Sequence, residues 1–479
     1  MIVRRVDVAV IGAGSAGMGA FRAARQHTDN VVVIDPGPFG TTCARVGCMP
    51  SKLLIAAAEA AHRAADAEGF GVRVGSVAID GHAVMARVRS ERDRFVGFVL
   101  ESVDGWPQAQ VLRHAARFSA PGELELDNGE RIQADRIVIA TGSRPAIPAG
   151  WRERLGKRLI TSDEVFDWQD LPASIAVVGA GVIGLELGQA LHRLGVRVRM
   201  YCRSGRPGGL TDPVVSEHAA ALLARDNPLE LHAQIESVAS TSNGVRVRHV
   251  VDGRSHDEEF EYVLAATGRI PNLEGLDLAA AGIPLDAHGR PQAEADSGQI
   301  GNSRVFLAGD ASDRRMLLHE ASDEGRIAGD NAGRYPDVRA RPRRAGLAVV
   351  FSDPQIAMAG QGFAELGSAG VDFAAAQLDF ADQGRSRVMR RNAGLLRVYG
   401  ERHTGRFLGA EMIGPDAEHL AHLLAWSVHA RLTVQQMLDA PFYHPVVEEG
   451  VRTALRLLNR ELHMGPPPIE RCLDCGPGA

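Results

Sequence analysis

The chain has 479 residues, of which 45% are apolar, and its formal net charge is −6. This length predicts about three domains, each with a core of its own. The negative net charge does not provide the positive field that attracts nucleic acid. No apolar run reaches the roughly 18 residues that a membrane span needs. We therefore expect no nucleic-acid partner, no membrane partner, and a cytoplasmic protein whose thiols stay reduced.

The first predicted element is a buried strand over residues 6–11, which leads into a glycine-rich turn and an Ala-rich helix. The next apolar run, residues 31–34, is followed by an acid. Such a β-α-β unit is typical of dinucleotide binding, because the glycines allow close approach to a pyrophosphate and the acid accepts bonds from ribose hydroxyls. One glycine pattern alone can also be an ordinary turn at a helix start. The candidate cofactor-binding residues are Gly12, Gly14, Gly17 and Asp35.

Two of the five cysteines, Cys43 and Cys48, follow in the stretch GTTCARVGCMPSK. A structural disulfide across so small a loop would add little to a chain that can bury ample core. Zinc would need a second pair of ligands, and the other close pair, Cys472 and Cys475, lies at the far end without matching histidines. We therefore predict no metal site, and the remaining interpretation is a dithiol that opens and closes.

The dinucleotide pattern recurs from residue 175. A strand, a glycine turn and a helix to about residue 194 are followed by a strand over residues 196–201. A repeated unit is far more specific than a single glycine pattern. The candidate cofactor-binding residues of this second unit are Gly179, Gly181 and Gly184.

Three shorter patterns each follow a buried strand. ATGSRP at residues 140–145 and ATGRIPN at residues 266–272 both close a strand with a turn, and VFLAGD at residues 305–310 ends on an acid. The candidate cofactor-binding residues in them are Thr141, Gly142, Gly268 and Asp310.

These motifs together make the sequence resemble a class I pyridine-nucleotide disulfide oxidoreductase, the family of lipoamide dehydrogenase, glutathione reductase and mercuric reductase. The resemblance runs from Val6 to about Leu458. It implies an α/β fold with two Rossmann-like dinucleotide-binding domains and a C-terminal α+β dimerisation domain. The implied divisions are an FAD-binding domain with the redox disulfide (1–150), an NAD(P)-binding domain (151–270), a central domain completing the FAD site (271–343), a dimerisation domain (344–464) and a mobile CxxC tail (465–479).

The resemblance also gives the cysteine pair a role. Cys43 and Cys48 would form a redox-active disulfide beside FAD, with electrons passing from NAD(P)H through FAD to Cys48, while Cys43 exchanges with the substrate. A helix start and nearby cations are expected to lower the pKa of Cys48. Lys52 would pair with Glu186 near N5 of the flavin, and the ordinary alternative for Glu186 is a solvated helix acid.

Near the C-terminus, His444 and Glu449 have the spacing of the family's catalytic base and the acid that orients it. A lone histidine is otherwise more often a surface or capping residue. In the family this base comes from the partner subunit, so the resemblance implies a homodimer with a shared active site. Val446 and Glu448 replace the family's Thr and Ser, and Glu448 could compete for the orienting role.

Three positions depart from the family pattern near the expected sites. Thr41 stands where a second glycine is usual, and Arg45 stands between the cysteines where a small polar residue is typical. Arg45 would either add positive charge near the thiolates or point to solvent. Val182 replaces the tyrosine that covers the nicotinamide pocket in glutathione reductase, and valine cannot act as an aromatic gate.

The coenzyme preference is predicted from the end of the second unit's last strand. Lipoamide dehydrogenases that use NAD carry a glutamate there, whereas this sequence has Arg203 and Arg206 and no acid. Arginines can bind a 2′-phosphate through charge-assisted hydrogen bonds, so we expect NADPH to be preferred over NADH. The alternative is a solvated basic loop.

The sequence therefore predicts an FAD-dependent oxidoreductase similar to dihydrolipoyl dehydrogenase, acting on a small dithiol, a disulfide or a lipoyl-bearing substrate. One alternative is an NADPH-dependent reductase of mercuric ion or of a small disulfide that uses Cys472 and Cys475; those two cysteines could also be an adventitious exposed dithiol. A second alternative is a non-catalytic flavin-bearing interaction subunit. The intact Cys43/Cys48 pair and the His444–Glu449 spacing argue against it.

Overall fold

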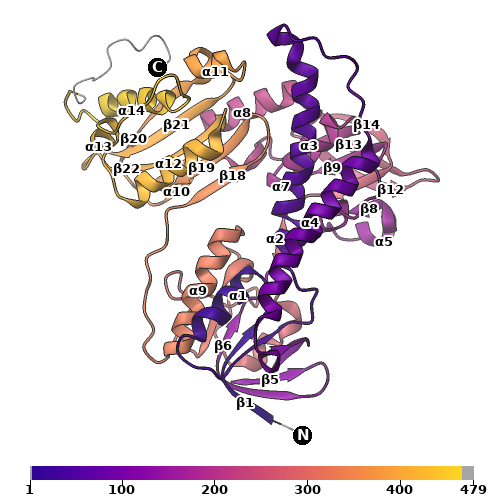
Figure 1. Cartoon of the computed structure of the whole chain (residues 1–479), viewed down its shortest axis with the longest axis vertical. Helices are drawn as coiled ribbons and strands as arrows, with labels where there is room; N and C mark the ends of the chain where they lie inside the picture. The colour runs from indigo at the N-terminus through magenta and orange to yellow at the C-terminus, as the bar shows by residue number, and fades with distance from the viewer. Residues whose placement is uncertain (1–2, 467–479) are drawn as a thin grey trace.

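The computed structural model describes residues 3–466, and three sheets with their helices form its three main parts (Figure 1). Cys472 and Cys475 lie outside the described residues. In Figure 1 the first sheet lies at the bottom, the second at the upper right and the third at the upper left. Within residues 3–466, no helix is long and apolar enough to cross a membrane.

The first sheet has seven strands and is mainly parallel at its centre. Residues 31–34, Val-Val-Val-Ile, are wholly buried, as expected of a strand covered on both faces. The order is β3-β2-β1-β6-β5-β4, with β17 pairing the C-terminal half of β6. The strands are β1 (Val3–Ile11), β2 (Val31–Ile34), β3 (Val111–Leu112), β4 (Ala116–Ala120), β5 (Glu123–Leu126), β6 (Arg131–Ile139) and β17 (Val305–Leu307).

Two helices with small residues at their contact cover this sheet, α1 (Ser15–Ala24) and α9 (Leu318–Arg334). A Cβ on Gly325 would lie 2.0 Å from the carbonyl oxygen of Ala16, and one on Gly329 would lie 2.2 Å from that of Ala20. Glycine is therefore required at both positions for the helices to approach so closely. This contact places the start of α9 beside the first glycine turn.

The second sheet is parallel, with the order β11-β10-β9-β15-β8. Its strands are β8 (Leu159–Ile160), β9 (Ser174–Val178), β10 (Arg197–Cys202), β11 (Leu229–Leu231) and β15 (Tyr262–Ala265); its helices are α7 (Val182–Arg193) and α8 (Pro213–Asp226). An antiparallel sheet of β12 (Gln234–Ser240), β13 (Val245–Val251) and β14 (Arg254–Phe260) lies beside it. A two-stranded ribbon, β7 (Ser143–Pro145) with β16 (Arg269–Pro271), joins the two ATG-containing segments.

The cysteine pair lies at the start of a group of helices that follows β2 in the chain. These helices are α2 (Thr42–Val46), α3 (Cys48–Asp66) and α4 (Gly81–Asp104), followed further along the chain by the short α5 (Trp151–Leu155) and α6 (Ser162–Val165). Leu54 and Ile55 of α3 share a core cluster with Leu185 of α7. Because α3 packs against α7, the start of α3 faces the second dinucleotide unit.

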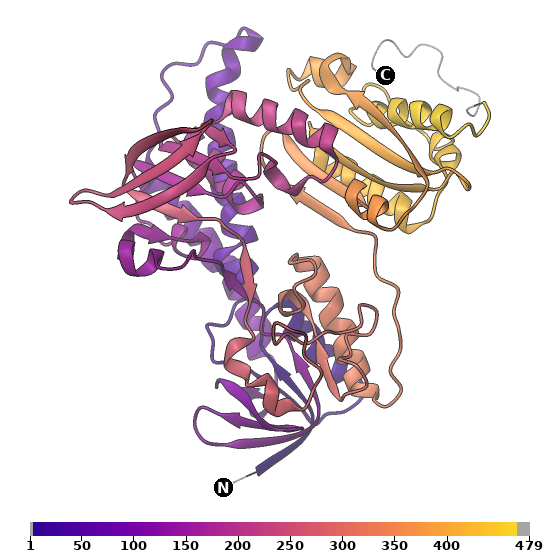
Figure 2. The same cartoon turned by 180° about the vertical axis from the view of Figure 1, so that it is seen from behind.

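The third sheet is antiparallel, with the order β18-β19-β22-β21-β20. Its strands are β18 (Leu347–Val350), β19 (Gln355–Gly360), β20 (Phe373–Asp379), β21 (Leu395–Glu401) and β22 (Phe407–Gly414). The accompanying helices are α10 (Phe363–Ser368), α11 (Gly384–Val388), α12 (Ala417–His429), α13 (Val434–Leu438) and α14 (Glu449–Glu461). Seen from behind, the segment from α9 to β18 runs along the outside of the molecule from the first sheet to the third (Figure 2).

Candidate active site

The two cysteines lie at the junction of two helices. Cys43 is in α2 and Cys48 is the first residue of α3, and both are free thiols. Thr41, where the family has glycine, adopts a φ of 61° and accepts a hydrogen bond from the amide of Ala44 at 3.2 Å. A left-handed conformation explains why glycine is usual at this position. The side chain of Arg45 turns back to donate to the carbonyl oxygen of Pro38 at 3.1 Å.

The two cysteines have pKa values that are shifted in opposite directions. A hydrogen bond from the Cys43 thiol, with help from the positive charge of Lys52 and against the effect of burial, lowers the pKa of Cys48 to about 7. The same interaction with Cys48, together with burial, raises the pKa of Cys43. The first proton lost therefore leaves a thiolate at Cys48. The direction of the pKa shift is the expected one, but its largest cause is the Cys43 thiol, and not the helix start or a cation.

Lys52 and Glu186 form a partly buried ion pair beside the cysteines. Lys52 is one turn after Cys48 on α3, and Glu186 is on α7. The Lys52 Nζ atom lies 2.7 Å and 2.9 Å from the two carboxylate oxygens of Glu186. The Glu186 side chain is only 4% exposed, so it is not the solvated helix acid of the alternative interpretation.

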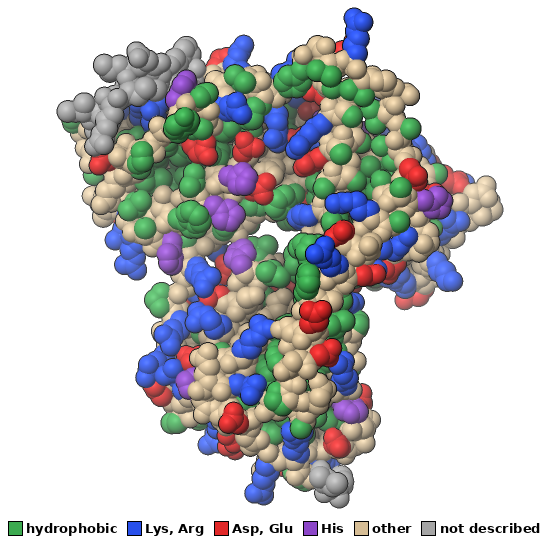
Figure 3. All heavy atoms as spheres, viewed as in Figure 1, with side chains coloured by type: hydrophobic (Ala, Val, Ile, Leu, Met, Phe, Trp, Pro, Cys, Tyr) green, Lys and Arg blue, Asp and Glu red, His purple; other side chains and the backbone are tan. Residues whose placement is uncertain are grey.

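A cavity of about 1260 Å³ connects both glycine turns with the cysteine pair. The space-filling view is hollowed where the three parts of the molecule meet (Figure 3). The residues that line this cavity include Gly14, Cys43, Cys48, Lys52, Gly142, Gly179, Gly181, Glu186, Arg203, Arg206, Gly268 and Asp310. The structure thus brings most of the predicted site residues to one cavity.

The first glycine turn is shaped to hold the pyrophosphate of a dinucleotide such as FAD. A Cβ on Gly17 would lie 1.8 Å from the carbonyl oxygen of Gly12, whereas one on Gly14 would point into open space. Gly14 caps α1 without a side-chain bond, so within residues 3–466 the first amides of α1 are free for an anion. The hydroxyl of Thr141 is buried without a partner among residues 3–466. These features fit FAD.

Two predicted acids also make contacts within the chain. Asp35 accepts hydrogen bonds from the amides of Ala13 and Gly37, both at 2.6 Å, so it fixes the glycine turn. Asp310 accepts from the hydroxyl of Ser143 at 2.6 Å and lines the cavity. The ribose contact predicted for Asp35 would add to the contacts that this carboxylate already makes.

The second glycine turn repeats the geometry of the first. A Cβ on Gly184 would lie 1.8 Å from the carbonyl oxygen of Gly179, and one on Gly181 would meet nothing within 4 Å. Arg203 and Arg206 are exposed just beyond β10 and line the cavity. Within residues 3–466 neither guanidinium makes an ion pair or hydrogen bond, so both are free for an anionic group.

His444 and Glu449 form a hydrogen-bonded pair at the start of α14. The Nδ1 atom of His444 lies 3.1 Å from both carboxylate oxygens of Glu449, whose side chain is 2% exposed. Glu449, and not Glu448, therefore orients the imidazole. The His444 side chain is 59% exposed and does not line the cavity that contains Cys43. Among residues 3–466 of one chain, the structure does not bring His444 to the cysteines.

Comparison with known proteins identifies the family. The model of pyridine nucleotide-disulphide oxidoreductases matches residues 6–325, and the dimerisation domain of the same family matches residues 347–455. The chain belongs to this family. The family and fold class predicted from the sequence are thereby confirmed, and the protein is an FAD-dependent oxidoreductase that uses NAD(P)H. The dimerisation domain supports a homodimer.

Named relatives of this oxidoreductase span several activities. Mercuric reductase of Shigella flexneri is 32% identical, covering 95% of this chain and 81% of the relative. Dihydrolipoyl dehydrogenase of Pseudomonas aeruginosa is 31% identical, covering 96% and 99%. Mycothione reductase of Mycobacterium tuberculosis is 30% identical, covering 94% and 98%. These names do not select one acceptor.

Solved structures agree on the fold of this oxidoreductase. LpdA from Mycobacterium tuberculosis has a TM-score of 0.77 at 26% identity and covers 94% of this chain and 99% of that one. The flavoprotein disulfide reductase RclA from Escherichia coli has a TM-score of 0.77 at 21% identity, covering 94% and 100%. The second likeness is evidence of the fold alone.

The sequence analysis missed Phe351, which lines the cavity and contacts the Lys52–Glu186 pair. The backbone amide of Phe351 donates to Glu186 at 3.0 Å, and its ring lies 4.6 Å from the Nζ atom of Lys52. Phe351 follows β18, at the start of the dimerisation domain, 165 residues from Glu186. A backbone donor has no sequence signature, and the segment was recognised only as the beginning of that domain.

Proposed function

We propose that the protein moves electrons between NAD(P)H and a small dithiol or disulfide through FAD and the Cys43/Cys48 pair, in the manner of dihydrolipoyl dehydrogenase. The observation that carries this proposal is the His444–Glu449 pair. Thiol–disulfide exchange needs a group that removes a proton from the attacking thiol and returns it to the leaving sulfur. An oriented, exposed imidazole supplies that group.

FAD, when bound, supplies the two-electron carrier between the nicotinamide and the sulfur pair. The first glycine turn would hold the pyrophosphate of FAD. The Thr141 hydroxyl would donate a hydrogen bond to FAD or accept one from it, and the Asp310 carboxylate would accept one. Lys52, fixed by Glu186, keeps a positive charge beside the Cys48 thiolate. That charge favours the ionised form of the sulfur.

The thiol half-reaction then follows from the proton positions. His444 of a second copy of the chain takes the proton of Cys43, whose thiolate attacks one sulfur of the substrate disulfide. A mixed disulfide forms, and the departing sulfur receives the proton from His444. The Cys48 thiolate next attacks the Cys43 sulfur, which closes the Cys43–Cys48 disulfide. The second substrate sulfur leaves and takes a proton from solvent, so one disulfide becomes two thiols.

Arg203 and Arg206 support NADPH as the preferred coenzyme. Each charge-assisted contact to a 2′-phosphate contributes about 1.5 to 3 kcal/mol. We expect Arg203→Gln to reduce the ratio of kcat/KM for NADPH to that for NADH by roughly tenfold or more. Arg225→Gln, which removes an exposed arginine on α8 that does not line the cavity, should leave the ratio unchanged. A wild-type enzyme that prefers NADH would contradict this assignment.

The second candidate is an NADPH-dependent reductase of mercuric ion or of a small disulfide. It is favoured by the two free arginines and by relatives that are named mercuric reductase and mycothione reductase. Cys472 and Cys475 would hand over electrons or a soft metal ion in this scheme. The paired cysteines and the His444–Glu449 contact disfavour a non-catalytic flavin-bearing subunit.

A panel of acceptors assayed with each coenzyme distinguishes the candidates. Lipoamide, glutathione disulfide and mercuric ion would be compared by kcat/KM in the full chain and in a chain truncated before Arg471. We expect lipoamide to be the best acceptor and its turnover to survive truncation. Mercuric ion as the best acceptor, with activity lost on truncation, would replace the first candidate by the second.

A further inference from the structure

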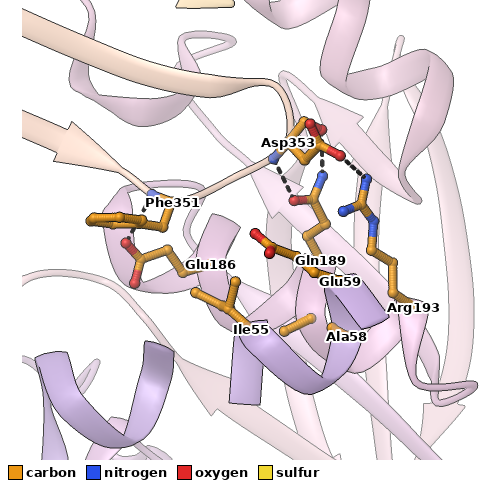
Figure 4. Close-up of a pocket in the computed structure, with 9 residues that line it drawn as sticks. Ile55, Ala58, Glu59, Glu186, Gln189, Arg193, Phe351 and Asp353 are labelled. Atoms are coloured by element: carbon orange, nitrogen blue, oxygen red, sulfur yellow. Dashed lines mark hydrogen bonds and ion pairs between the residues drawn. The ribbon is translucent and has the colours of Figure 1, made fainter. Parts of the chain in front are cut away.

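The segment Phe351–Asp353 binds along one stripe of α7 (Figure 4). Glu186, Gln189 and Arg193 lie on the same face of the helix, because they are three, four and seven positions apart. Phe351 donates its amide to Glu186 at 3.0 Å. Asp353 donates its amide to Gln189 at 2.7 Å and accepts from the Gln189 side chain at 2.9 Å. These bonds attach the start of the dimerisation domain to the coenzyme-binding unit.

The far end of this attachment is fixed by charge. The guanidinium of Arg193 lies 2.9 Å from the carboxylate of Asp353, and Arg193 is only 13% exposed. Asp353 is also 3.6 Å from Arg391, which follows α11. Gln189 is buried, and its side-chain amide also donates to Asn227 at 3.1 Å. The segment therefore has few ways to shift relative to α7.

Phe351 contacts both members of the catalytic ion pair. Its amide bonds the Glu186 carboxylate, while its ring faces the Lys52 ammonium at 4.6 Å from the ring centre. Attraction between a cation and an aromatic face strengthens as water is excluded, and Lys52 is only 32% exposed here. Besides Phe351 and Glu186, the described chain offers the ammonium the Ser51 hydroxyl, at 3.3 Å.

We propose that Phe351 is a positioning residue, which fixes the Lys52–Glu186 pair from the dimerisation domain and so sets where the Lys52 charge sits beside Cys48. Its meaning for catalysis rests on the proposed function. The ring limits the sideways movement of the ammonium, and the amide fixes the carboxylate to which the ammonium is bonded. The geometry of the electron-transfer site thus depends on the contact between two separate units of the chain.

The sequence provides an internal reference for testing this arrangement. Lys52 and Lys157 are the only lysines among the 479 residues, and Lys157 lies far from Phe351 in the chain. The FAD-loaded protein is treated with a small acylating reagent that reacts with amines. Peptide mass spectrometry then gives the ratio of Lys52 labelling to Lys157 labelling. A less restrained amine reacts faster, so the ratio reports on how firmly Lys52 is held.

In Phe351→Leu we expect this ratio to rise about twofold to fivefold, the range that corresponds to losing one cation–π contact. Phe351→Tyr keeps the aromatic face and should give the wild-type ratio. Phe351→Met keeps side-chain bulk without the ring, so it tests the same loss if the leucine variant does not fold. Phe373→Leu is the matched control, because Phe373 is half-buried in the same domain but packs against Phe363 and Tyr399.

An unchanged ratio in folded Phe351→Leu or Phe351→Met would overturn the proposal. So would an equal rise in Phe373→Leu, which would show general loosening of the domain. The labelling needs no turnover, so it separates this proposal from the proposed function. A raised ratio in a protein that reduces no disulfide would leave the positioning role intact. An unchanged ratio in an active disulfide reductase would remove the positioning role alone.

Discussion

Replacing Cys48 by serine should reduce NAD(P)H-dependent disulfide reduction to background while FAD remains bound. Cys48 carries the first thiolate of the pair, at the start of α3 and beside Lys52. A thiolate next to an oxidised flavin gives a long-wavelength charge-transfer absorbance, which we expect in the two-electron-reduced wild type. Cys48→Ser should lack this absorbance, because serine does not ionise at neutral pH.

The pH dependence of the absorbance follows from the lowered pKa of Cys48. The thiolate is present above the pKa and is lost as the sulfur is protonated below it. The charge-transfer absorbance should therefore grow as pH rises, with a midpoint near 7 if the bound flavin leaves the pKa where the protein sets it. A spectrophotometric titration of the reduced wild type measures the midpoint directly.

Two other cysteine variants serve as controls for this experiment. Cys43→Ser cannot form the disulfide, so its Cys48 thiolate should give the absorbance in the oxidised enzyme, before any reductant is added, and the variant should have no disulfide turnover. Cys202→Ser removes the third free cysteine of the described residues, which is buried at the end of β10, and should retain the absorbance too. Persistence of the absorbance in Cys48→Ser would contradict the assignment of Cys48 as the flavin-side thiol.

Local patterns predicted the glycine turns well because the backbone conformation itself demands these residues. Gly12 has a φ of 106° and Gly179 one of 109°, and the third glycine of each turn leaves no room for a Cβ. The chain can meet these demands only with glycine, so the sequence records them. Thr41 differs from these glycines, because it adopts a φ of 61° with a side chain present, so the backbone at that position favours glycine without requiring it.

Contacts between distant segments were predicted only where the family resemblance supplied them. Lys52 and Glu186 are 134 residues apart, and nothing in their own neighbourhoods pairs them. Phe351 was missed because its contact with Glu186 uses a backbone amide and depends on how two units pack. The sequence assigned the carboxylate of Asp35 to a ribose and did not indicate that it also accepts hydrogen bonds from the amides of Ala13 and Gly37. The type of a side chain does not by itself show which distant residue it contacts.

Replacing His444 by alanine should slow the thiol–disulfide half-reaction by about 100-fold or more, the usual effect of losing a general base. Reduction of the flavin by NADPH should keep its wild-type rate, because His444 does not line the cavity that contains the cysteines and both glycine turns. Stopped-flow measurement of the two half-reactions separates the effects. His403→Ala, which removes an 81% exposed histidine of the same domain, is the matched control. Equal slowing of both halves would make His444 a structural residue.

A mixed dimer tests whether His444 acts on the cysteines of the other chain. Cys43→Ser and His444→Ala homodimers should each be inactive in disulfide reduction. If the site is shared, a heterodimer of the two variants has one site with both defects and one with both wild-type residues. Unfolding and refolding an equal mixture should then recover roughly a quarter of the wild-type sites, since about half of the dimers are mixed. No recovery in a mixture that contains heterodimers would mean that each His444 serves the cysteines of its own chain. In the described part of a single chain, His444 does not line the cavity that contains Cys43.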